Sequence, residues 1–290
     1  MDSPPNVDIT LILLGHGSTV NGASAAPVFQ HCALLKKQGK FADVKPAFWK
    51  QEPQILEVIG STNTSRIITV PFFISAGFFS DKTIPESLGY GPTDPASGCR
   101  SIRQPGHVLV YTQPIGTHDK MTEVLLSRAR GVVAEFPFPR PPRPDDISLF
   151  IAGHGTDQNE NSRQSIERQV ELISARHIYA DVHAIFLDES PRIPECYEIA
   201  TKRNLVVVPF FVSDGMHVQE DIPVLLGEPE RLVKQRLAQN RPPWRNPNEK
   251  KGKLVWYAQA VGSDPLAAEV ALERAEEAMR FLSTISGVQV

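Results

Sequence analysis

The chain has 290 residues, 41% of them hydrophobic and 22% charged, and a formal net charge of −3. This length predicts about two domains, and the lack of a basic excess argues against nucleic acid or an anionic membrane as a partner. No apolar run approaches the ~18 residues of a membrane span, and the polar, acidic first residues predict no signal peptide. The three cysteines are far apart, which predicts neither disulfides nor an iron–sulfur cluster and favours a reducing cytoplasm.

The first half of the chain alternates short apolar runs with helical patterns. The pattern predicts strands at residues 9–14, 44–49, 67–74 and 107–113, followed by a helix at residues 119–130. Glycine and proline make residues 90–106 a predicted loop. Five prolines between residues 135 and 146 then predict a stiff linker.

The second half repeats the first at a spacing of 138 residues, the separation of His16 from His154 and of Pro71 from Pro209. ITLILLGHGS at residues 9–18 recurs as ISLFIAGHGT, and VPFFISAG at residues 70–77 recurs as VPFFVSDG. Strands are predicted at residues 147–152, 182–187, 205–212 and 253–260, and helices at residues 162–176, 194–202 and 264–282. A proline-rich loop at residues 240–253 corresponds to the loop at residues 90–106.

These patterns predict an α/β fold. Apolar strands that alternate with helices are typical of a parallel sheet buried on both faces. We expect two tandem domains related by internal duplication, each a parallel sheet of about four strands flanked by helices. The predicted boundaries are residues 1–135 for the first copy, 136–146 for the linker and 147–290 for the second copy.

Polar side chains follow three strands of the second copy. His154 comes directly after the first strand, Asp188 and Glu189 follow the second, and His217 follows the third. Ligands of open parallel sheets bind beyond the carboxyl ends of the strands, so we expect these side chains at one rim. Two neutral imidazoles and a carboxylate suit a borderline divalent metal such as cobalt, nickel, iron or zinc. With so few protein ligands the site is open and the ion exchangeable, and the imidazoles are also able to accept protons.

The first copy differs at this rim, because Phe79 stands at the position of His217. His16 has two interpretations: a functional residue, or a histidine bonded to backbone in a tight strand-to-helix turn. Phe78 and Phe79 either pack in the core or form an apolar bed for a flat ligand. A structural or surface role is expected for the other histidines, His31, His107, His118, His177 and His183.

Three motifs of the second copy follow one another in a fixed order. They are the GHG after the first strand, the acid after the second (FLDE at residues 186–189) and PFFVSDGMHVQEDIP at residues 209–223. Together they resemble the CbiX/SirB family of sirohydrochlorin chelatases, and the pattern G-x-H-x-x-x-D-I-P at residues 215–223 is the most specific piece. The resemblance covers most of both halves outside the proline-rich loops. It implies the long, two-repeat form of a class II chelatase, which inserts cobalt or ferrous iron into sirohydrochlorin without ATP.

The resemblance assigns roles to the second copy residue by residue. His154 and His217 match the metal-binding histidines, and Asp188 falls near the family's acidic residue, with a shorter spacing than the usual FLE-x-x-EP. Insertion of the metal requires two pyrrole N–H groups to lose their protons. One histidine, or Asp188 or Glu189, is expected to accept them.

The first copy departs from the family pattern. It keeps His16 and the pair Glu52–Pro53, but it has Phe79 at the second histidine and Thr83 where Asp221 stands. We therefore expect it to supply one wall of a tetrapyrrole cleft between the two halves, with His16 facing the macrocycle. The expected substrate contacts are His16, Ser18, Thr156, Phe79, Met216 and Arg163.

The expected substrates are a sirohydrochlorin-like tetrapyrrole and a divalent metal, Co²⁺, Fe²⁺ or Ni²⁺, with no organic cofactor. Both the cobalamin and the sirohaem pathway stay open. A monomer suffices for two copies in one chain, and a homodimer stays open. The rival hypotheses are a non-catalytic metal or tetrapyrrole carrier, a degenerate paralogue, and a metal-dependent or cysteine hydrolase. The cysteine form of the hydrolase is disfavoured because no cysteine follows a strand beside a histidine.

Overall fold

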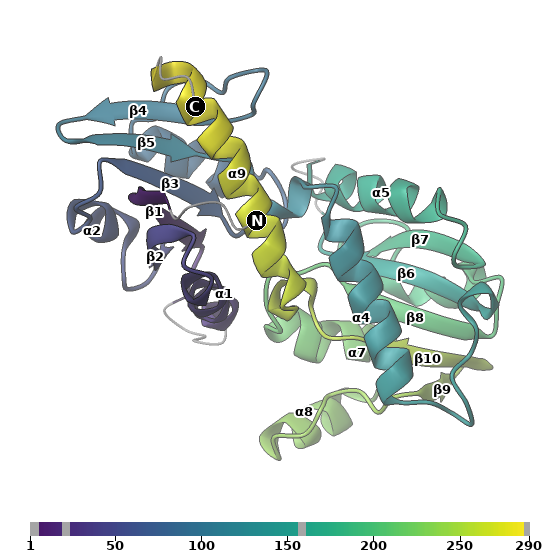
Figure 1. Cartoon of the computed structure of the whole chain (residues 1–290). Coiled ribbons are helices and arrows are strands. Elements are labelled where there is room, and N and C mark those ends of the chain that lie inside the picture. Colours follow the sequence, from purple (N-terminus) through teal and green to yellow (C-terminus); the bar gives the residue numbers. More distant parts are fainter. Residues whose placement is uncertain (1–5, 19–23, 156–160, 287–290) are drawn as a thin grey trace. The chain divides into compact units, whose positions relative to one another are not determined.

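The computed structural model describes residues 6–18, 24–155 and 161–286, and the chain divides into two compact units (Figure 1). Unit 1 comprises Met1–His118 and Pro265–Val290, and unit 2 comprises Asp119–Asp264. Each unit holds a five-stranded, mostly parallel sheet with helices on both faces, so the predicted α/β class and internal duplication are confirmed. In the described part of the chain, no helix combines the length and the apolar character that crossing a bilayer requires.

The sheet of unit 1 has the strand order β2-β1-β3-β5-β4. Its parallel strands are β2 (Phe41–Phe48), β1 (Asn6–Gly15), β3 (Arg66–Pro71) and β5 (His107–Tyr111), and β4 (Arg100–Gln104) pairs antiparallel with β5. One face packs against α1 (Ala26–Lys37) and α9 (Leu266–Ser286), and the other against α2 (Ile55–Gly60) and α3 (Ile84–Ser87). The π-helix η2 (Phe78–Thr83) and the 3₁₀ turn η3 (Ile115–Thr117) follow β3 and β5.

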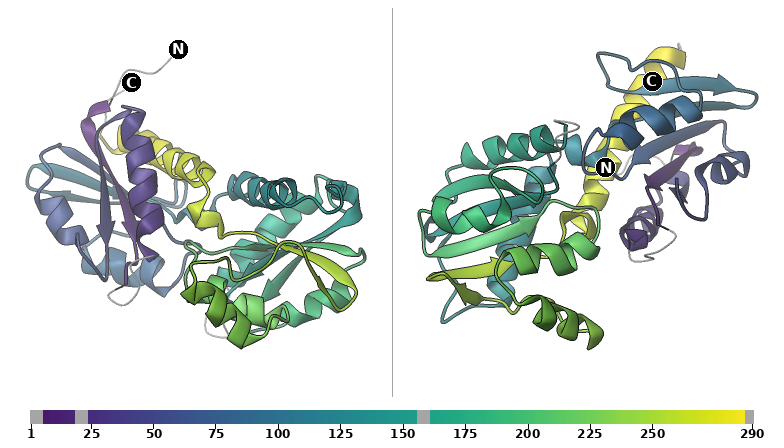
Figure 2. Two further views of the ribbon diagram at one scale, coloured as in Figure 1. Left: turned by 90° about the horizontal axis from the view of Figure 1, so that it is seen from below. Right: turned by 180° about the vertical axis from the view of Figure 1, so that it is seen from behind.

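The sheet of unit 2 repeats this order as β7-β6-β8-β10-β9. Its strands are β7 (Asp181–Phe186), β6 (Ile147–Gly153), β8 (Asn204–Pro209), β10 (Lys253–Tyr257) and the antiparallel edge strand β9 (Asn248–Lys250). One face carries α4 (Met121–Glu135) and α5 (Asn161–Ser174), and the other carries α6 (Cys196–Ile199), α7 (Ile222–Leu225) and α8 (Glu230–Ala238) (Figure 2). The short turns are η4 (Pro144–Asp146), η5 (Ile193–Glu195), η6 (His217–Asp221) and η7 (Val261–Ser263).

The central strand β6 explains why this sequence folds as a covered sheet. All seven of its residues are buried, and their side chains alternate between the two faces. Phe150 and Ala152 join the core cluster under α6 and α7, while Leu149 and Ile151 point to the opposite face. A strand that is apolar at every position is stable only between two layers of helices.

The edge strands β4 and β9 differ from the sequence prediction, which placed loops there. Both strands are short, and their sequences, RSIRQ and NEK, carry no run of apolar residues. Each is positioned by its antiparallel neighbour, β5 or β10, rather than by a buried face of its own. A search of the sequence for apolar runs therefore does not detect these two strands.

The compact units also differ from the predicted boundaries at residues 1–135, 136–146 and 147–290. The last helix of the first copy, α4, packs in unit 2 on β8 and β10, and the last helix of the second copy, α9, packs in unit 1 on β3 and β5. In unit 2, Thr122 of α4 donates a buried hydrogen bond of 2.7 Å to Gln169 of α5. The sequence copies have thus exchanged their final helices, and the proline-rich segment at residues 136–146 lies within unit 2.

Candidate metal centre

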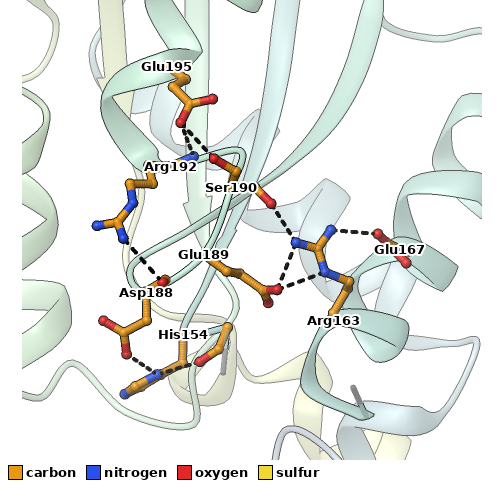
Figure 3. Close-up of polar contacts among 9 residues, drawn as sticks. His154, Arg163, Glu167, Asp188, Glu189, Ser190, Arg192 and Glu195 are labelled. Carbon is orange, nitrogen blue, oxygen red and sulfur yellow. Dashed lines mark hydrogen bonds and ion pairs between the residues drawn. The ribbon is translucent and has the colours of Figure 1, made fainter. Parts of the chain in front are cut away.

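His154 lies at the carboxyl end of β6, directly after Gly153. Its Nδ1 is 2.8 Å from the carbonyl oxygen of Gly155 and 3.1 Å from Oδ2 of Asp188 (Figure 3). Both of these oxygens are acceptors, so Nδ1 carries the proton and donates it. The lone pair of the neutral ring therefore resides on Nε2, the nitrogen that remains available to a metal.

His217 opens the π-helix η6, beyond the end of β8. Its Nδ1 donates to Oδ2 of Asp221 across 2.6 Å, one turn further along the same element. Hydrogen bonds to a carboxylate are short and strong, and they fix both the orientation and the tautomer of an imidazole. The lone pair of His217 thus also resides on Nε2. Asp221 was placed in the family motif by its sequence but was given no role there.

The two imidazoles lie side by side, with ring centroids 4.9 Å apart and planes at 88°. Two imidazoles that share one ion through bonds of about 2.1 Å have ring centres about 4.5–5.2 Å apart when the angle at the metal is about 90–110°. The observed separation falls within that range. The side chains of His154 and His217 are 47% and 41% exposed, and neither Nε2 has a hydrogen-bond partner among the described residues.

The described residues supply no third metal ligand at this site. No group of three or more histidine, cysteine, aspartate or glutamate side chains among the described residues has the arrangement of a metal site. The carboxylates of Asp188 and Asp221 face the Nδ1 atoms rather than the open side of the rings. The arrangement therefore offers two nitrogen ligands and leaves the other coordination positions to other molecules, which is typical of an open site with an exchangeable ion.

Arg163 of α5 braces the loop that carries the carboxylates (Figure 3). Its guanidinium donates to Oε2 of Glu189 at 2.8 and 3.0 Å, to Glu167 at 3.0 Å and to the carbonyl of Ser190, and it lies 4.5 Å from the ring centre of Phe186. The hydrogen bond to Glu189, opposed by partial burial, raises the pKa of Arg163 above its ordinary value. These partners occupy the guanidinium, which was predicted from the sequence to hold substrate carboxylates.

Gly155 is required by close packing against the same loop. Its φ is +70°, and a Cβ atom there would lie 2.6 Å from Cγ and 2.7 Å from Oε1 of Glu189. Only glycine combines a left-handed backbone with this approach. The side chain of Glu189 is 17% exposed, and its Oε1 has no hydrogen-bond partner among the described residues. Glu189 therefore faces the glycine turn and Arg163, whereas Asp188 faces His154.

Unit 1 repeats the scaffold with different side chains. Nδ1 of His16 donates to the carbonyl of Gly17 at 2.8 Å, and the ring centroid of His16 lies 4.8 Å from that of Phe79 at 71°. Phe79 thus occupies the place that His217 has in unit 2. Lys50 and Thr83 stand at the positions of the two aspartates, by the spacing of 138 residues.

The other predicted site residues are placed as follows. Met216 is 60% exposed beside His217, and the backbone N–H of Ser18 donates to Oε1 of Gln51 at 2.8 Å. Thr156 lies outside the described residues. Of the histidines given a structural role, His107 bonds the carbonyl of Thr64 at 2.8 Å.

The fold is thus a pair of duplicated α/β units, and unit 2 carries two oriented imidazoles, a candidate site for a divalent metal, beyond the carboxyl ends of its parallel strands. The chain belongs to the CbiX family, whose sequence model matches residues 10–132 and 148–278. It is 36% identical over 278 residues to a probable sirohydrochlorin cobaltochelatase of Halobacterium salinarum, across 92% of this chain and 91% of the relative. It is 28% identical over 141 residues to the sirohydrochlorin cobaltochelatase of Methanopyrus kandleri, across 46% of this chain and 97% of the relative.

Solved structures share the fold. DR2241 of Deinococcus radiodurans, a multi-domain protein with structural similarity to chelatases, superposes with a TM-score of 0.75 at 24% identity, over 94% of this chain and 55% of that protein. SirB of Bacillus subtilis, solved with Fe³⁺, superposes with a TM-score of 0.66 at 19% identity, over 93% of this chain and 95% of SirB. The family predicted from the three motifs is confirmed.

Proposed function

We propose that this chain is a metal chelatase that inserts Co²⁺ or Fe²⁺ into sirohydrochlorin without ATP, with Ni²⁺ as a third candidate ion. The pair of Nε2 lone pairs on His154 and His217, in rings 4.9 Å apart, supports this most directly. Membership of a family whose curated relatives are named sirohydrochlorin cobaltochelatases supports the tetrapyrrole as the second substrate.

The two histidines hold the metal substrate, and the two aspartates hold the histidines. Asp221 fixes His217 through a bond of 2.6 Å, and Asp188 with the Gly155 carbonyl fixes His154. Ligands that are already oriented lose little freedom when the ion binds. Because only two nitrogens are supplied, the ion keeps positions that the macrocycle nitrogens are able to take.

Proton balance follows from the same pair of rings. Insertion of one divalent ion displaces two protons from the pyrrole nitrogens, and departure of the ion leaves two Nε2 lone pairs behind. Each imidazole is then able to accept one proton, so that the charge of the site is unchanged when the metal is replaced by two protons. The exposed carboxylate of Asp188 is the alternative acceptor, whereas Glu189 is engaged by Arg163.

The remaining predicted residues contact the macrocycle. Met216 presents an exposed apolar side chain beside His217, and His16, Ser18 and Phe79 are assigned to the substrate surface of unit 1. Thr156 stays a predicted contact to a substrate carboxylate. For Arg163, its occupied guanidinium favours a positioning role, in which it holds Glu189 and thereby the glycine turn after His154.

The test is an anaerobic assay with sirohydrochlorin and either Co²⁺ or Fe²⁺, followed by the loss of the free-base absorption spectrum. We expect multiple turnovers from the wild type and none from His217→Ala. At saturating sirohydrochlorin we expect retained turnover from His16→Ala, in which the loss of a macrocycle contact weakens substrate binding but leaves the metal ligands in place. The His16 variant is the matched control, since it removes the equivalent histidine from the copy that lacks a second one.

The same assay separates the alternatives. A carrier metallates at most one ring per chain, so a single burst of that size would replace the enzyme assignment with a binding function. A rate no greater than the uncatalysed one with every ion would reject both.

A further inference from the structure

The two units keep one scaffold but carry opposite charge at equivalent positions. In both, the histidine after the first strand bonds the next glycine carbonyl at 2.8 Å. In both, a tyrosine hydroxyl donates a hydrogen bond of 2.7 Å to a carbonyl of the π-helix that precedes it in the chain, from Tyr111 to Ser80 of η2 and from Tyr257 to Val218 of η6. The ring centroid that faces the histidine lies 4.8 Å away in unit 1 and 4.9 Å away in unit 2.

On this common scaffold, unit 1 keeps the first histidine, His16, but differs from unit 2 at the other three positions. Asp188 becomes Lys50, His217 becomes Phe79 and Asp221 becomes Thr83. With neutral histidines, the formal charge of the four positions changes from −2 in unit 2 to +1 in unit 1. Unit 1 therefore lacks three of the four groups and also carries a positive charge at this rim.

The backbone of Lys50 is fixed at this rim by a hydrogen bond, and its side chain is exposed to solvent, where a ligand is able to reach it. Its backbone N–H donates to the carbonyl of His16 at 2.8 Å, as that of Asp188 does to His154 at 3.1 Å. Its Nζ lies 5.8 Å from the ring centre of Phe79, and the side chain is exposed without an ion pair to any described residue. The nearby Glu52 instead accepts a hydrogen bond from the backbone N–H of Gln54 at 3.2 Å.

Next to this ammonium group lies an apolar surface. The ring of Phe78 packs edge-on against Phe79 with centroids 5.6 Å apart, and Phe78 is 63% exposed. An exposed ring beside a cation that has no ion pair with the described residues matches a ligand that is flat and apolar and carries carboxylates at its periphery. A hydrated divalent ion has neither property.

We propose that Lys50 binds a peripheral carboxylate of the free-base tetrapyrrole, with Phe78 and Phe79 against the ring, and that unit 1 binds no divalent metal. This rests on the proposed function for the identity of the tetrapyrrole. Unit 1 is accordingly a substrate-recognition unit rather than a second metal centre.

The test is a fluorescence titration of metal-free sirohydrochlorin into the full chain, for the wild type, Lys50→Gln and Lys50→Glu. A partly exposed ion pair predicts affinity about threefold weaker for the glutamine variant and about tenfold weaker for the glutamate variant at low salt. The difference in tetrapyrrole affinity between the wild type and the Lys50 variants should shrink at about 0.5 M salt, where the Debye length falls to a few ångströms. Lys37→Gln, which removes a positive charge from the end of α1, is the matched control and should bind as the wild type does.

A Co²⁺ titration of the same proteins separates this proposal from the function itself. We expect unchanged Co²⁺ affinity in the Lys50 variants, and lost Co²⁺ binding with retained free-base binding in His217→Ala. Wild-type tetrapyrrole affinity in Lys50→Glu would overturn the role of Lys50 and leave the metal centre standing. No tetrapyrrole binding by the wild type would overturn the proposed function as well.

The converse experiment rebuilds the site of unit 2 in unit 1. In a His217→Ala background, the changes Lys50→Asp, Phe79→His and Thr83→Asp should restore binding of one Co²⁺ per chain and weaken free-base binding. A folded protein, judged by circular dichroism, that binds no Co²⁺ would show that the two scaffolds are not equivalent and would refute the proposal's premise.

Discussion

Asp221 offers the sharpest test of how the candidate centre is organised. Its carboxylate accepts the Nδ1 proton of His217 at 2.6 Å, whereas Asp188 lies 3.1 Å from Nδ1 of His154, which also bonds the Gly155 carbonyl at 2.8 Å. Asp221→Asn leaves Nδ1 of His217 with a neutral amide oxygen as its one acceptor among the described residues, but Asp188→Asn leaves Nδ1 of His154 with the Gly155 carbonyl as well. The two aspartates are therefore expected to differ in their effect.

The size of the expected loss in Co²⁺ affinity follows from the contacts of each aspartate and from their exposure to solvent. Carboxylates that orient a ligating histidine are worth about 10–100-fold in metal affinity. The side chains of His217 and Asp221 are 41% and 45% exposed, so solvent screens their interaction. The loss of metal affinity in Asp221→Asn is therefore expected at the lower end of this range. We expect a loss of about tenfold, or about 1.4 kcal/mol, for Asp221→Asn and about threefold for Asp188→Asn.

Calorimetric titration with Co²⁺ measures these affinities directly. The control is Asp81→Asn, which removes a carboxylate that is 56% exposed from the equivalent π-helix of unit 1 and should leave the affinity unchanged. Affinity within about twofold of wild type for Asp221→Asn, alongside lost binding in His217→Ala, would refute the orienting role. A larger loss for Asp188→Asn than for Asp221→Asn would refute the reasoning from the shared acceptor.

Three further outcomes are expected. Gly155→Ala should lower the free energy of unfolding by about 2 kcal/mol in a denaturant titration, and by more than Gly252→Ala, whose φ of +74° is similar but whose surroundings are open. Burial acts to raise the pKa of Glu277, but hydrogen bonds from His118 and Arg274 outweigh it and lower that pKa to about 2. The resulting stability is present above pH ~4.5 and is lost as the pH falls toward ~2, so Glu277→Gln should cost about 1–2 kcal/mol at neutral pH and nothing at about pH 2. Burial raises the thiol pKa to about 11 or 12, so at pH ~8 an aromatic disulfide reagent should react slowly with the native protein and at once with the three thiols of the denatured chain, Cys32, Cys99 and Cys196.

The rim of unit 2 was predictable because strand ends are visible in sequence. His154, Asp188 and His217 each follow an apolar run, and the geometry of a parallel sheet brings such positions to one edge. The contact between His217 and Asp221 was less visible, since it depends on the π-helical turn that places them together. The hydrogen bonds that engage the guanidinium of Arg163 depend on how α5 packs against β7, and a sequence pattern does not specify that packing.

The exchange of the final helices was not predictable for a related reason. An amphipathic helix requires a sheet face, but the two sheets have the same strand order, and both have buried apolar strands. The periodicity of α4 and α9 therefore predicts that each is buried without selecting the sheet that covers it. The sheet on which each helix packs is shown instead by contacts that are specific to one helix–sheet pairing, such as the hydrogen bond from Thr122 to Gln169.

This exchange fixes the order in which the units are completed during synthesis on the ribosome. All of unit 2, Asp119–Asp264, has been translated before the final segment of unit 1, Pro265–Val290, begins. Until α9 emerges, β3 and β5 present an uncovered apolar face that a nascent chain must protect, while unit 2 already has all of its elements. A premature stop after residue 264 would consequently spare the unit that carries His154 and His217 and leave the unit that was translated first without its last helix.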